Sequence, residues 1–210
     1  GLKGLAALHS QNWNRIDPSL NWVKQWKPTQ GWQVGLRKRT PMGLERGRDL
    51  LPLELADITG DAIVDHWVQF VSSLRTGPQS LLHGDAHIGN TYILPDDKVG
   101  FLDWQVVRRG HWSQDVGYFL VGALTLEDRR AHDRDLLRHY FDALSEPDKG
   151  SFDEAWQRYR MSHAYGLAIW LSTLGTDGWQ AHDISRALVS RYAAAFVEHD
   201  TRGALKEAGF

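Results

Sequence analysis

The sequence predicts an α+β fold that is mostly helical. Three observations lead to this class. Apolar residues recur at helical spacing over residues 59–75, further capped amphipathic segments follow residue 112, and two short β-prone runs flank a polar turn between them. The 210 residues are enough for one domain with its own core. We therefore expect a single domain over 1–210, made of an irregular lead-in, a helix plus hairpin, and a helical subdomain: 1–58, 59–104 and 105–210.

The segment 1–58 is expected to be irregular and rich in aromatic residues. Residues 4–10 have the pattern of a helix end, and residues 11–33 mix tryptophan with proline, asparagine and glutamine. The tryptophans are Trp13, Trp22, Trp26 and Trp32. These tryptophans could form a lid over a substrate, or they could pack a long connecting segment onto the domain. We favour the second interpretation. Further on, Pro41 fits the first turn of a helix and Pro52 its end.

A long amphipathic helix is predicted over residues 59–75. Its apolar positions share one face and are Ile63, Val64, Trp67, Val68, Val71 and Leu74. Thr59 or Asp61 is suited to cap its start, because a side-chain oxygen there accepts a hydrogen bond from a backbone N–H. The run Thr-Gly-Pro at 76–78 ends the helix and turns the chain toward an apolar strand at Leu81.

Residues 81–104 combine short strands with side chains that can carry out chemistry. Those side chains are His83, Asp85, His87, Asn90 and Asp103. The runs 92–94 and 99–102 are β-prone, and the residues between them have turn chemistry, which predicts a β-hairpin. Asn90 comes just before the first strand and Asp103 just after the second. In an antiparallel pair, the start of one strand lies beside the end of the other, so we expect these two residues to be neighbours.

The oxygen-bearing residues at this end of the hairpin suit a magnesium ion. Magnesium prefers carboxylate and amide oxygens and keeps several of its waters, so Asn90 and Asp103 are the candidate ligands. Asp85, on the loop upstream, is then available to orient a hydroxyl group and to accept its proton. His83 stands two residues before Asp85 and is placed to hold that loop by hydrogen bonds.

Four helices are predicted after the hairpin. Capping residues or patterns mark their starts at Ser113, Thr125, Ser151 and about residue 182. Asp115 lies in the first turn of the first of these helices, where the helix dipole favours an anion. The last helix covers residues 182–198. Before them, Arg108 and Arg109 could bind a phosphate, although we favour a surface pair.

The catalytic candidates form a motif with defined spacing. His83-Gly84-Asp85 is followed after four residues by Asn90, and thirteen positions later by Asp103. This pattern resembles the catalytic loop and metal-binding aspartate of kinases. The form HGDxHxGN followed by LDW resembles the aminoglycoside phosphotransferase and choline kinase superfamily, and within it most closely the ecdysteroid-kinase-like small-molecule kinases. The later run GHWSQDVGYFL is similar to the same family.

The resemblance implies a protein-kinase-like C-terminal lobe in which a small hairpin carries the catalytic loop. It implies that Asp85 is the catalytic base, that His83 is the second catalytic-loop candidate, and that Asp115 is a structural support of the loop. Asn90 and Asp103 would hold Mg²⁺ on the phosphates of ATP. The implied reaction is the phosphorylation of a hydroxyl group on a small-molecule acceptor.

The N-terminal lobe that usually closes such a site is expected to be absent from this chain. Upstream of Leu81, no glycine-rich stretch suits a phosphate cover, and no strand carries a lysine suited to pair with ATP. We therefore expect the parent protein to supply that lobe. We also expect that the chain alone does not turn over a substrate.

Two other functions fit parts of the pattern. The first is a metal-dependent hydrolase, in which His83, Asp85 and His87 bind Zn²⁺ or Mn²⁺ and activate a water molecule. Gly84 and the fit of Asn90 and Asp103 to the kinase pattern speak against it. The second is a non-catalytic kinase-like binding or scaffold module. The presence of Asp85, Asn90 and Asp103 together speaks against that, because a module without activity has no need of all three.

Composition narrows the partners and the compartment. The net charge is −2, so no basic excess indicates nucleic acid or a membrane surface as a partner. There is no cysteine, which excludes disulfides and thiolate metal sites within the chain. No apolar run has the length of a membrane span, and no signal peptide is visible. We expect a soluble, cytoplasmic protein that binds a nucleotide and a small molecule.

Overall fold

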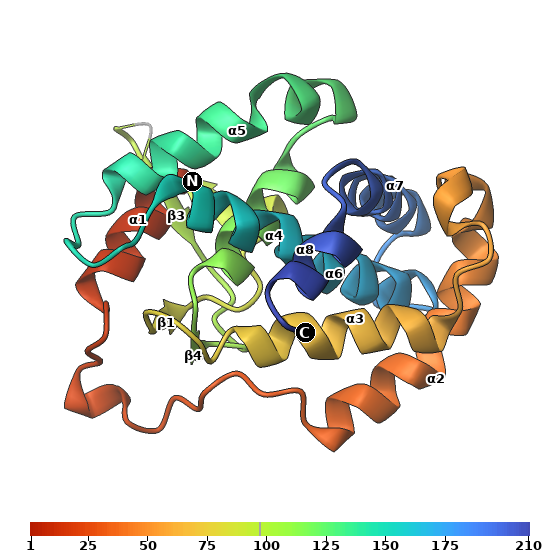
Figure 1. Ribbon diagram of the computed structural model, residues 1–210, viewed down its shortest axis with the longest axis horizontal. Coiled ribbons are helices and arrows are strands. Elements are labelled where there is room, and N and C mark those ends of the chain that lie inside the picture. The colour runs from red at the N-terminus through yellow and green to blue at the C-terminus, as the bar shows by residue number, and fades with distance from the viewer. Residues whose placement is uncertain (97) are drawn as a thin grey trace. The chain divides into compact units, whose positions relative to one another are not determined.

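The helices and strands belong to two structural units in the computed structural model, which describes residues 1–96 and 98–210 (Figure 1). Unit 1 consists of Gly1–Trp26 and Leu74–Tyr159, and unit 2 of Lys27–Ser73 and Arg160–Phe210. The sequence predicted a single domain made of three consecutive segments. The contacts group stretches that are far apart in the sequence, and residues of the lead-in belong to both units.

Unit 1 contains three whole helices and the start of a fourth. They are α1 (Leu2–Gln11), α4 (Ser113–Ala123), α5 (Leu126–Ala143) and the first part of α6 (Phe152–Leu174). Helix α1 packs against α5 and α4, and Figure 1 shows α1 lying along α5. The apolar core between them includes Leu5, Ala6, Val116, Leu120 and Leu137. This packing places the start of α4 next to the end of α1.

Unit 1 also holds two small antiparallel sheets. Strand β1 (Ser80–Leu82) pairs with β4 (Arg108–Gly110), and β2 (Thr91–Ile93) pairs with β3 (Val99–Phe101). Strands β2 and β3 overlap the two runs, 92–94 and 99–102, that the sequence predicted to pair. Asp97, in its predicted turn, lies outside the described residues. A short 3₁₀ turn, η4 (Ile88–Asn90), leads directly into β2.

The lead-in is partly ordered by its contacts within unit 1. Trp13 donates from Nε1 to Asp148 at 2.7 Å, and the backbone N–H of Trp26 donates to the carbonyl of Arg109 at 2.8 Å. Both tryptophans are buried, whereas Trp22 is exposed. A 3₁₀ turn, η1 (Pro18–Leu20), lies between them. Trp13 and Trp26 therefore pack the lead-in onto unit 1, as the favoured interpretation expected.

Unit 2 is built from helices. They are α2 (Gln30–Gly47), α3 (Gly60–Ser73), the remainder of α6, α7 (His182–Glu198) and α8 (Thr201–Glu207), with two 3₁₀ turns, η2 (Arg48–Leu50) and η3 (Leu53–Leu55). Helix α2 approaches α6 so closely that a Cβ at Gly43 would lie 1.9 Å from the carbonyl oxygen of Leu171. Helix α2 also packs on α3, which buries Leu36, Ile63 and Trp67.

Helix α2 corrects the prediction for the lead-in. Residues 11–33 are not irregular throughout, since α2 begins at Gln30, and Pro41 lies inside this helix rather than at its start. The helix continues through the proline because tertiary contacts outweigh the local break. Arg37 pairs with Asp61 of α3 at 2.8 Å, and Arg39 donates to Ser172 of α6 at 2.7 Å.

Two of the helices after the hairpin have the predicted caps. Helix α4 begins at Ser113 and α7 covers His182–Glu198, as predicted, but Ser113 is the first helical residue rather than the cap, and neither helix start has a side-chain cap. Thr125 accepts a hydrogen bond from the N–H of Asp128, and Ser151 exchanges hydrogen bonds with Glu154 in a capping box. Helix α8 was not predicted. Among the described residues, no helix combines the length and apolar character that a bilayer crossing requires.

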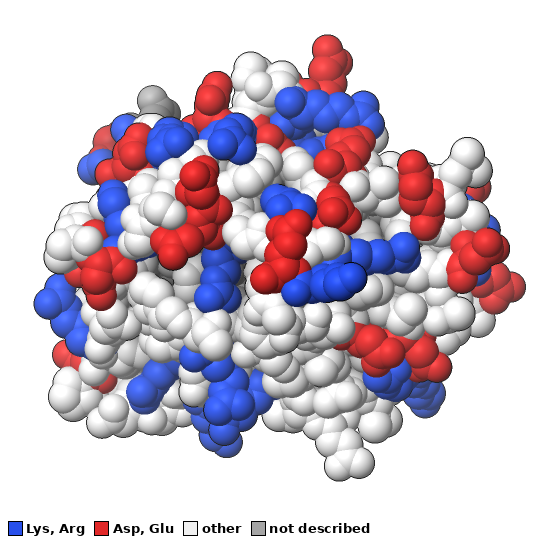
Figure 2. Space-filling view, in the orientation of Figure 1, with Lys and Arg blue, Asp and Glu red and all other residues white. Residues whose placement is uncertain are grey.

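Acidic and basic side chains are interspersed on the face of the molecule that Figure 2 shows. Several charged side chains of the protein form ion pairs, such as Arg186 with Asp49 and Arg160 with Glu207. Charge alone therefore does not single out a binding surface on that face. The functional site has to be located from side-chain geometry.

Candidate active site

A loop after β1 carries the candidate catalytic residues, and Gly84 fixes its path. Gly84 has a φ of +87°, which L-residues rarely adopt. A Cβ at this position would lie 2.1 Å from the carbonyl oxygen of Val106. The loop can therefore pass close to the segment after Asp103 only because this residue is glycine.

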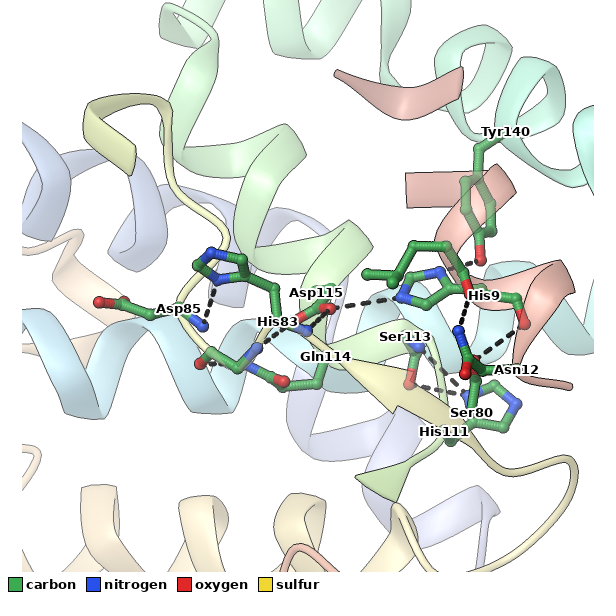
Figure 3. Close-up of polar contacts among 12 residues, drawn as sticks. His9, Asn12, Ser80, His83, Asp85, His111, Ser113, Gln114, Asp115 and Tyr140 are labelled. Carbon is green, nitrogen blue, oxygen red and sulfur yellow. Dashed lines mark hydrogen bonds and ion pairs between the residues drawn. The ribbon is translucent and has the colours of Figure 1, made fainter. Parts of the chain in front are cut away.

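Asp115, in the first turn of α4, anchors the same loop. Its Oδ2 accepts a hydrogen bond from the N–H of His83 at 2.7 Å, and its Oδ1 accepts one from the N–H of Gly84 at 2.9 Å (Figure 3). Asp115 is fully buried. The neighbouring Gln114 donates from Nε2 to the carbonyl of Gly84 at 2.9 Å. The start of α4 thus satisfies three backbone groups of the loop with two side chains.

His83 connects the loop to the end of β3. Its Nε2 lies 2.9 Å from the carbonyl oxygen of Leu102, and its Nδ1 accepts a hydrogen bond from the N–H of Asp85 at 3.2 Å. We assign the proton to Nε2, because a carbonyl oxygen only accepts and a backbone N–H only donates. The ring also packs against Trp104, with 4.6 Å between centroids. Buried in this way, His83 acts as a positioning residue for Asp85.

Asn90 holds Asp85 from the other side. Its Nδ2 donates to the backbone oxygen of Asp85 at 3.1 Å and lies 3.3 Å from the carboxylate Oδ2. The carbonyl of Asn90 accepts from the N–H of Leu102 at 3.0 Å. Asn90 therefore lies opposite the residue that precedes Asp103, as the antiparallel hairpin predicts.

Asp103 follows β3 with an unusual backbone conformation. Its φ is +63°, a left-handed value that costs free energy for most residues and that aspartate tolerates better than most. The residue is exposed, and its Oδ2 is 3.4 Å from Nε2 of Gln105. The backbone thus turns sharply at the residue for which a metal-binding role was predicted.

Burial dominates the electrostatics of the loop. It raises the pKa of Asp85 above the ordinary value of 3.8, and the negative charge of Asp103 adds to this effect, whereas His87 and His83 oppose it. Burial also lowers the pKa of His87, whose Nε2 is 3.9 Å from Oδ2 of Asp85. The charged form of Asp85 is thus disfavoured in this protein, and a cation near Asp85 and Asp103 would relieve it.

The trio proposed for a hydrolase does not form a metal site. Both ring nitrogens of His83 already take part in hydrogen bonds, with Leu102 and with Asp85. Within the described part of the chain, no group of three or more histidine, aspartate or glutamate residues is placed to hold a metal ion. This arrangement does not support His83, Asp85 and His87 as a zinc site.

The two arginines considered for phosphate binding instead hold the lead-in. Arg108 donates to the carbonyl of Val107 at 2.7 Å and stacks on the ring of Trp26, and Arg109 lies 3.3 Å from the carbonyl of Asn21. Sequence reasoning favoured a surface pair. The arginines are half-buried on β4, where their contacts are structural.

Sequence reasoning missed three residues of the loop's support: Gln114, His9 and Tyr140. Gln114 stands directly before Asp115, so its position in the first turn of α4 was a usable signal. His9 lies on α1 and contacts Asp115, and Tyr140 lies on α5 and contacts His9. Both follow the apolar pattern of their helices, and no local spacing links them to the loop.

Two solved structures share the fold of this chain. An ethanolamine kinase from Plasmodium vivax matches with a TM-score of 0.57 at 15% identity, over 97% of this chain and 59% of its own. A spectinomycin phosphotransferase solved with ADP and spectinomycin matches with a TM-score of 0.56 at 12% identity, over 95% of this chain and 64% of its own. The chain thus spans about three fifths of the length of these two proteins.

The chain belongs to the ecdysteroid kinase-like family. The model of that family matches residues 44–149, which is half of the chain and includes the loop, the hairpin and α4. A comparison with curated protein sequences gives no match. The family and the solved structures together establish a small-molecule kinase fold and confirm the resemblance read from the motif.

Proposed function

We propose that the full-length protein transfers the γ-phosphoryl group of ATP to a hydroxyl group of a small molecule, with Mg²⁺ as cofactor. One observation carries the proposal: Asn90 holds Asp85 in a loop that Asp115 fixes, and the carbonyl of Asn90 accepts a hydrogen bond from Leu102, the residue before Asp103. Membership of the ecdysteroid kinase-like family supports it.

In this proposal Asp85 is the group that faces the acceptor. Its carboxylate accepts the hydroxyl proton while the acceptor oxygen bonds to the γ-phosphorus and the bond to ADP breaks. The raised pKa of Asp85 suits this role, because a base whose pKa is closer to the working pH takes up a proton more readily. His83 keeps the loop in place through its bonds to Leu102 and to the N–H of Asp85.

Asn90 and Asp103 are the residues that would hold Mg²⁺. Asn90 uses its amide nitrogen on Asp85, which leaves the amide oxygen as its ligand atom. Asp103 offers an exposed carboxylate from the end of β3. Both are hard oxygen donors of the kind that magnesium prefers. When bound, the ion would neutralise charge on the phosphates of ATP.

We propose further that an N-terminal lobe in the parent protein completes the site. A phosphate-covering loop and an ATP-pairing lysine are parts that a kinase needs and that the residues before Leu81 do not offer. The matched solved structures are longer than this chain, which supports the proposal. We expect the chain without that lobe to be inactive, and the complete enzyme to act in the cytoplasm.

The test compares three forms of the full-length protein: wild type, Asp85→Asn, and Asp96→Asn as a control on the exposed hairpin turn. Phosphoryl transfer from ATP is measured against a panel of small hydroxylated compounds, and ATP binding is measured by calorimetry. We expect Asp85→Asn to lose about 10²- to 10⁴-fold in turnover while ATP binding stays nearly unchanged.

Two results would argue against this assignment. Equal losses of binding and turnover in Asp85→Asn would remove Asp85 from the role of base. Binding of ATP by the wild type with no transfer to any acceptor, under conditions where a known kinase of this fold is active, would favour the non-catalytic binding module. Asp96→Asn should match the wild type in both measurements.

A further inference from the structure

A buried chain of hydrogen bonds leads from α5 through α1 to the catalytic loop. Tyr140 of α5 has its Oη 2.7 Å from Nδ1 of His9 on α1, and Nε2 of His9 is 3.3 Å from Oδ2 of Asp115 (Figure 3). All three residues have 0% exposure. Asp115 in turn accepts the N–H groups of His83 and Gly84. A series of contacts across three helices therefore ends at the carboxylate that holds the loop.

The hydrogen bonds in this chain have one consistent direction. A carboxylate only accepts, so we assign the proton of His9 to Nε2, which donates to Asp115. In the neutral ring, Nδ1 is then an acceptor and takes the hydroxyl hydrogen of Tyr140. Burial raises the pKa of Tyr140 well above its ordinary value of 10.0, and the charge of Asp115 adds to this, so the hydroxyl keeps its hydrogen.

The buried carboxylate of Asp115 is stabilised by the hydrogen bond that His9 donates. A buried charge is costly unless hydrogen bonds satisfy its oxygens. Its Oδ2 is shared between His83 and His9, and its Oδ1 is taken by Gly84. Without His9, Oδ2 would keep a single donor, and the carboxylate could rotate away from one of the two loop amides.

We propose that His9 and Tyr140 are positioning residues of the active site, which hold Asp115 in the orientation that fixes the backbone of His83 and Gly84. Neither residue reaches the reacting atoms. The consequence for the structure of the loop stands on the observed geometry alone, whereas the consequence for turnover rests on the proposed kinase function.

Tyr140→Phe tests the inference, because it removes one hydroxyl group and keeps the ring. Tyr159→Phe is the matched control: Tyr159 is also fully buried in unit 1, and its hydroxyl is 3.4 Å from Oδ2 of Asp133, away from the loop. Backbone hydrogen exchange is measured in the full-length protein. We expect the amides of His83 and Gly84 to exchange roughly five- to tenfold faster in Tyr140→Phe, which corresponds to one net hydrogen bond, and at the wild-type rate in Tyr159→Phe.

Substitutions at His9 separate the hydrogen bonds from the volume of the side chain. His9→Gln keeps an amide N–H for Asp115 and an oxygen for Tyr140, whereas His9→Leu keeps neither. We expect His9→Gln to stay near the wild-type exchange rate and His9→Leu to exceed that of Tyr140→Phe. In the active enzyme, His9→Leu should lower kcat with little change in KM, because the acceptor site is not touched.

Two outcomes would overturn the inference. One is an equal exchange rate of His83 and Gly84 in Tyr140→Phe and Tyr159→Phe, and the other is equal exchange in His9→Leu and His9→Gln. Failure of the proposed function is a separate result: absent kinase activity in the wild type, with the exchange differences intact, would refute the kinase and leave the positioning role supported.

Discussion

The surroundings of Asp85 disfavour the charged form of its carboxyl group. Burial and the nearby Asp103 raise its pKa above 3.8, so the folded protein binds this proton more tightly than the unfolded chain does. The free energy of unfolding should therefore fall as pH rises from about 3.8 through the raised value, and the deficit should persist at neutral pH. Such a cost is expected where a group is kept for its chemistry rather than for stability.

The first prediction follows from this cost. Asp85→Asn should raise the melting temperature at neutral pH, because it removes the disfavoured charge and keeps the shape of the side chain. Thermal unfolding of both forms, measured between about pH 4 and pH 8, should show their difference growing as pH rises. Asp96→Asn is the control, since the exposed Asp96 pairs with Lys98 and its pKa is lowered by that contact. A melting temperature of Asp85→Asn below the wild type across this range would contradict the account.

Gly84 shows how a single position joins two elements. The loop after β1 and the segment after β3 approach each other so closely that a Cβ at Gly84 would meet the carbonyl oxygen of Val106 at 2.1 Å. The residue also has a φ of +87°. The first glycine of the motif thus allows the loop that carries Asp85 to pass close to the segment that follows Asp103.

The second prediction concerns the loss of stability when a side chain is added at Gly84. Gly84→Ala should lower the free energy of unfolding by roughly 2–4 kcal/mol, from backbone strain and the steric clash together. Gly178→Ala is a matched control, because Gly178 has a φ of +80° and nothing within 4 Å of an added Cβ; it should cost about 1 kcal/mol. Urea unfolding of both variants gives the comparison. Equal losses would mean that the contact with Val106 is not limiting.

Local signals predicted some elements well and others poorly. The capping residues at Thr125 and Ser151 and the turn chemistry of the hairpin act over a few residues, so the sequence alone located α5, α6 and the β2–β3 pair. The bounds of helix α2 were misplaced, because its first turns depend on contacts with α3 and α6, including the pairing of Arg37 with Asp61. The proline inside it is a strong local signal for the wrong element boundary.

In the candidate site, too, local spacing predicts some residues, whereas others come together only in the folded protein. The spacing of Asp85, Asn90 and Asp103 was readable because one loop and one hairpin carry all three. His9 and Tyr140 were not readable, because they are 131 positions apart and meet only through the packing of α1 against α5. Of the distant partners of the loop, Asp115 was predicted only through the family resemblance, and His9 and Tyr140 were missed.

At the scale of the whole molecule, the family model and the matched solved structures agree on a small-molecule kinase fold. The family model covers half of the chain, and the chain covers about three fifths of the two matched solved structures. Because the chain covers less than two thirds of either matched structure, phosphoryl transfer stays a proposal. The residues described in this structure would supply the base, the metal ligands and the support of the loop.

The most direct test of this account is the magnesium dependence of ATP binding to the full-length protein, measured by calorimetry for wild type, Asp103→Asn and Asp96→Asn. If Asp103 holds Mg²⁺ on the phosphates, Mg²⁺ should strengthen ATP binding at least about tenfold in the wild type and in Asp96→Asn, and Asp103→Asn should lose most of that gain. A full magnesium effect in Asp103→Asn, or none in the wild type, would contradict the assignment of this site.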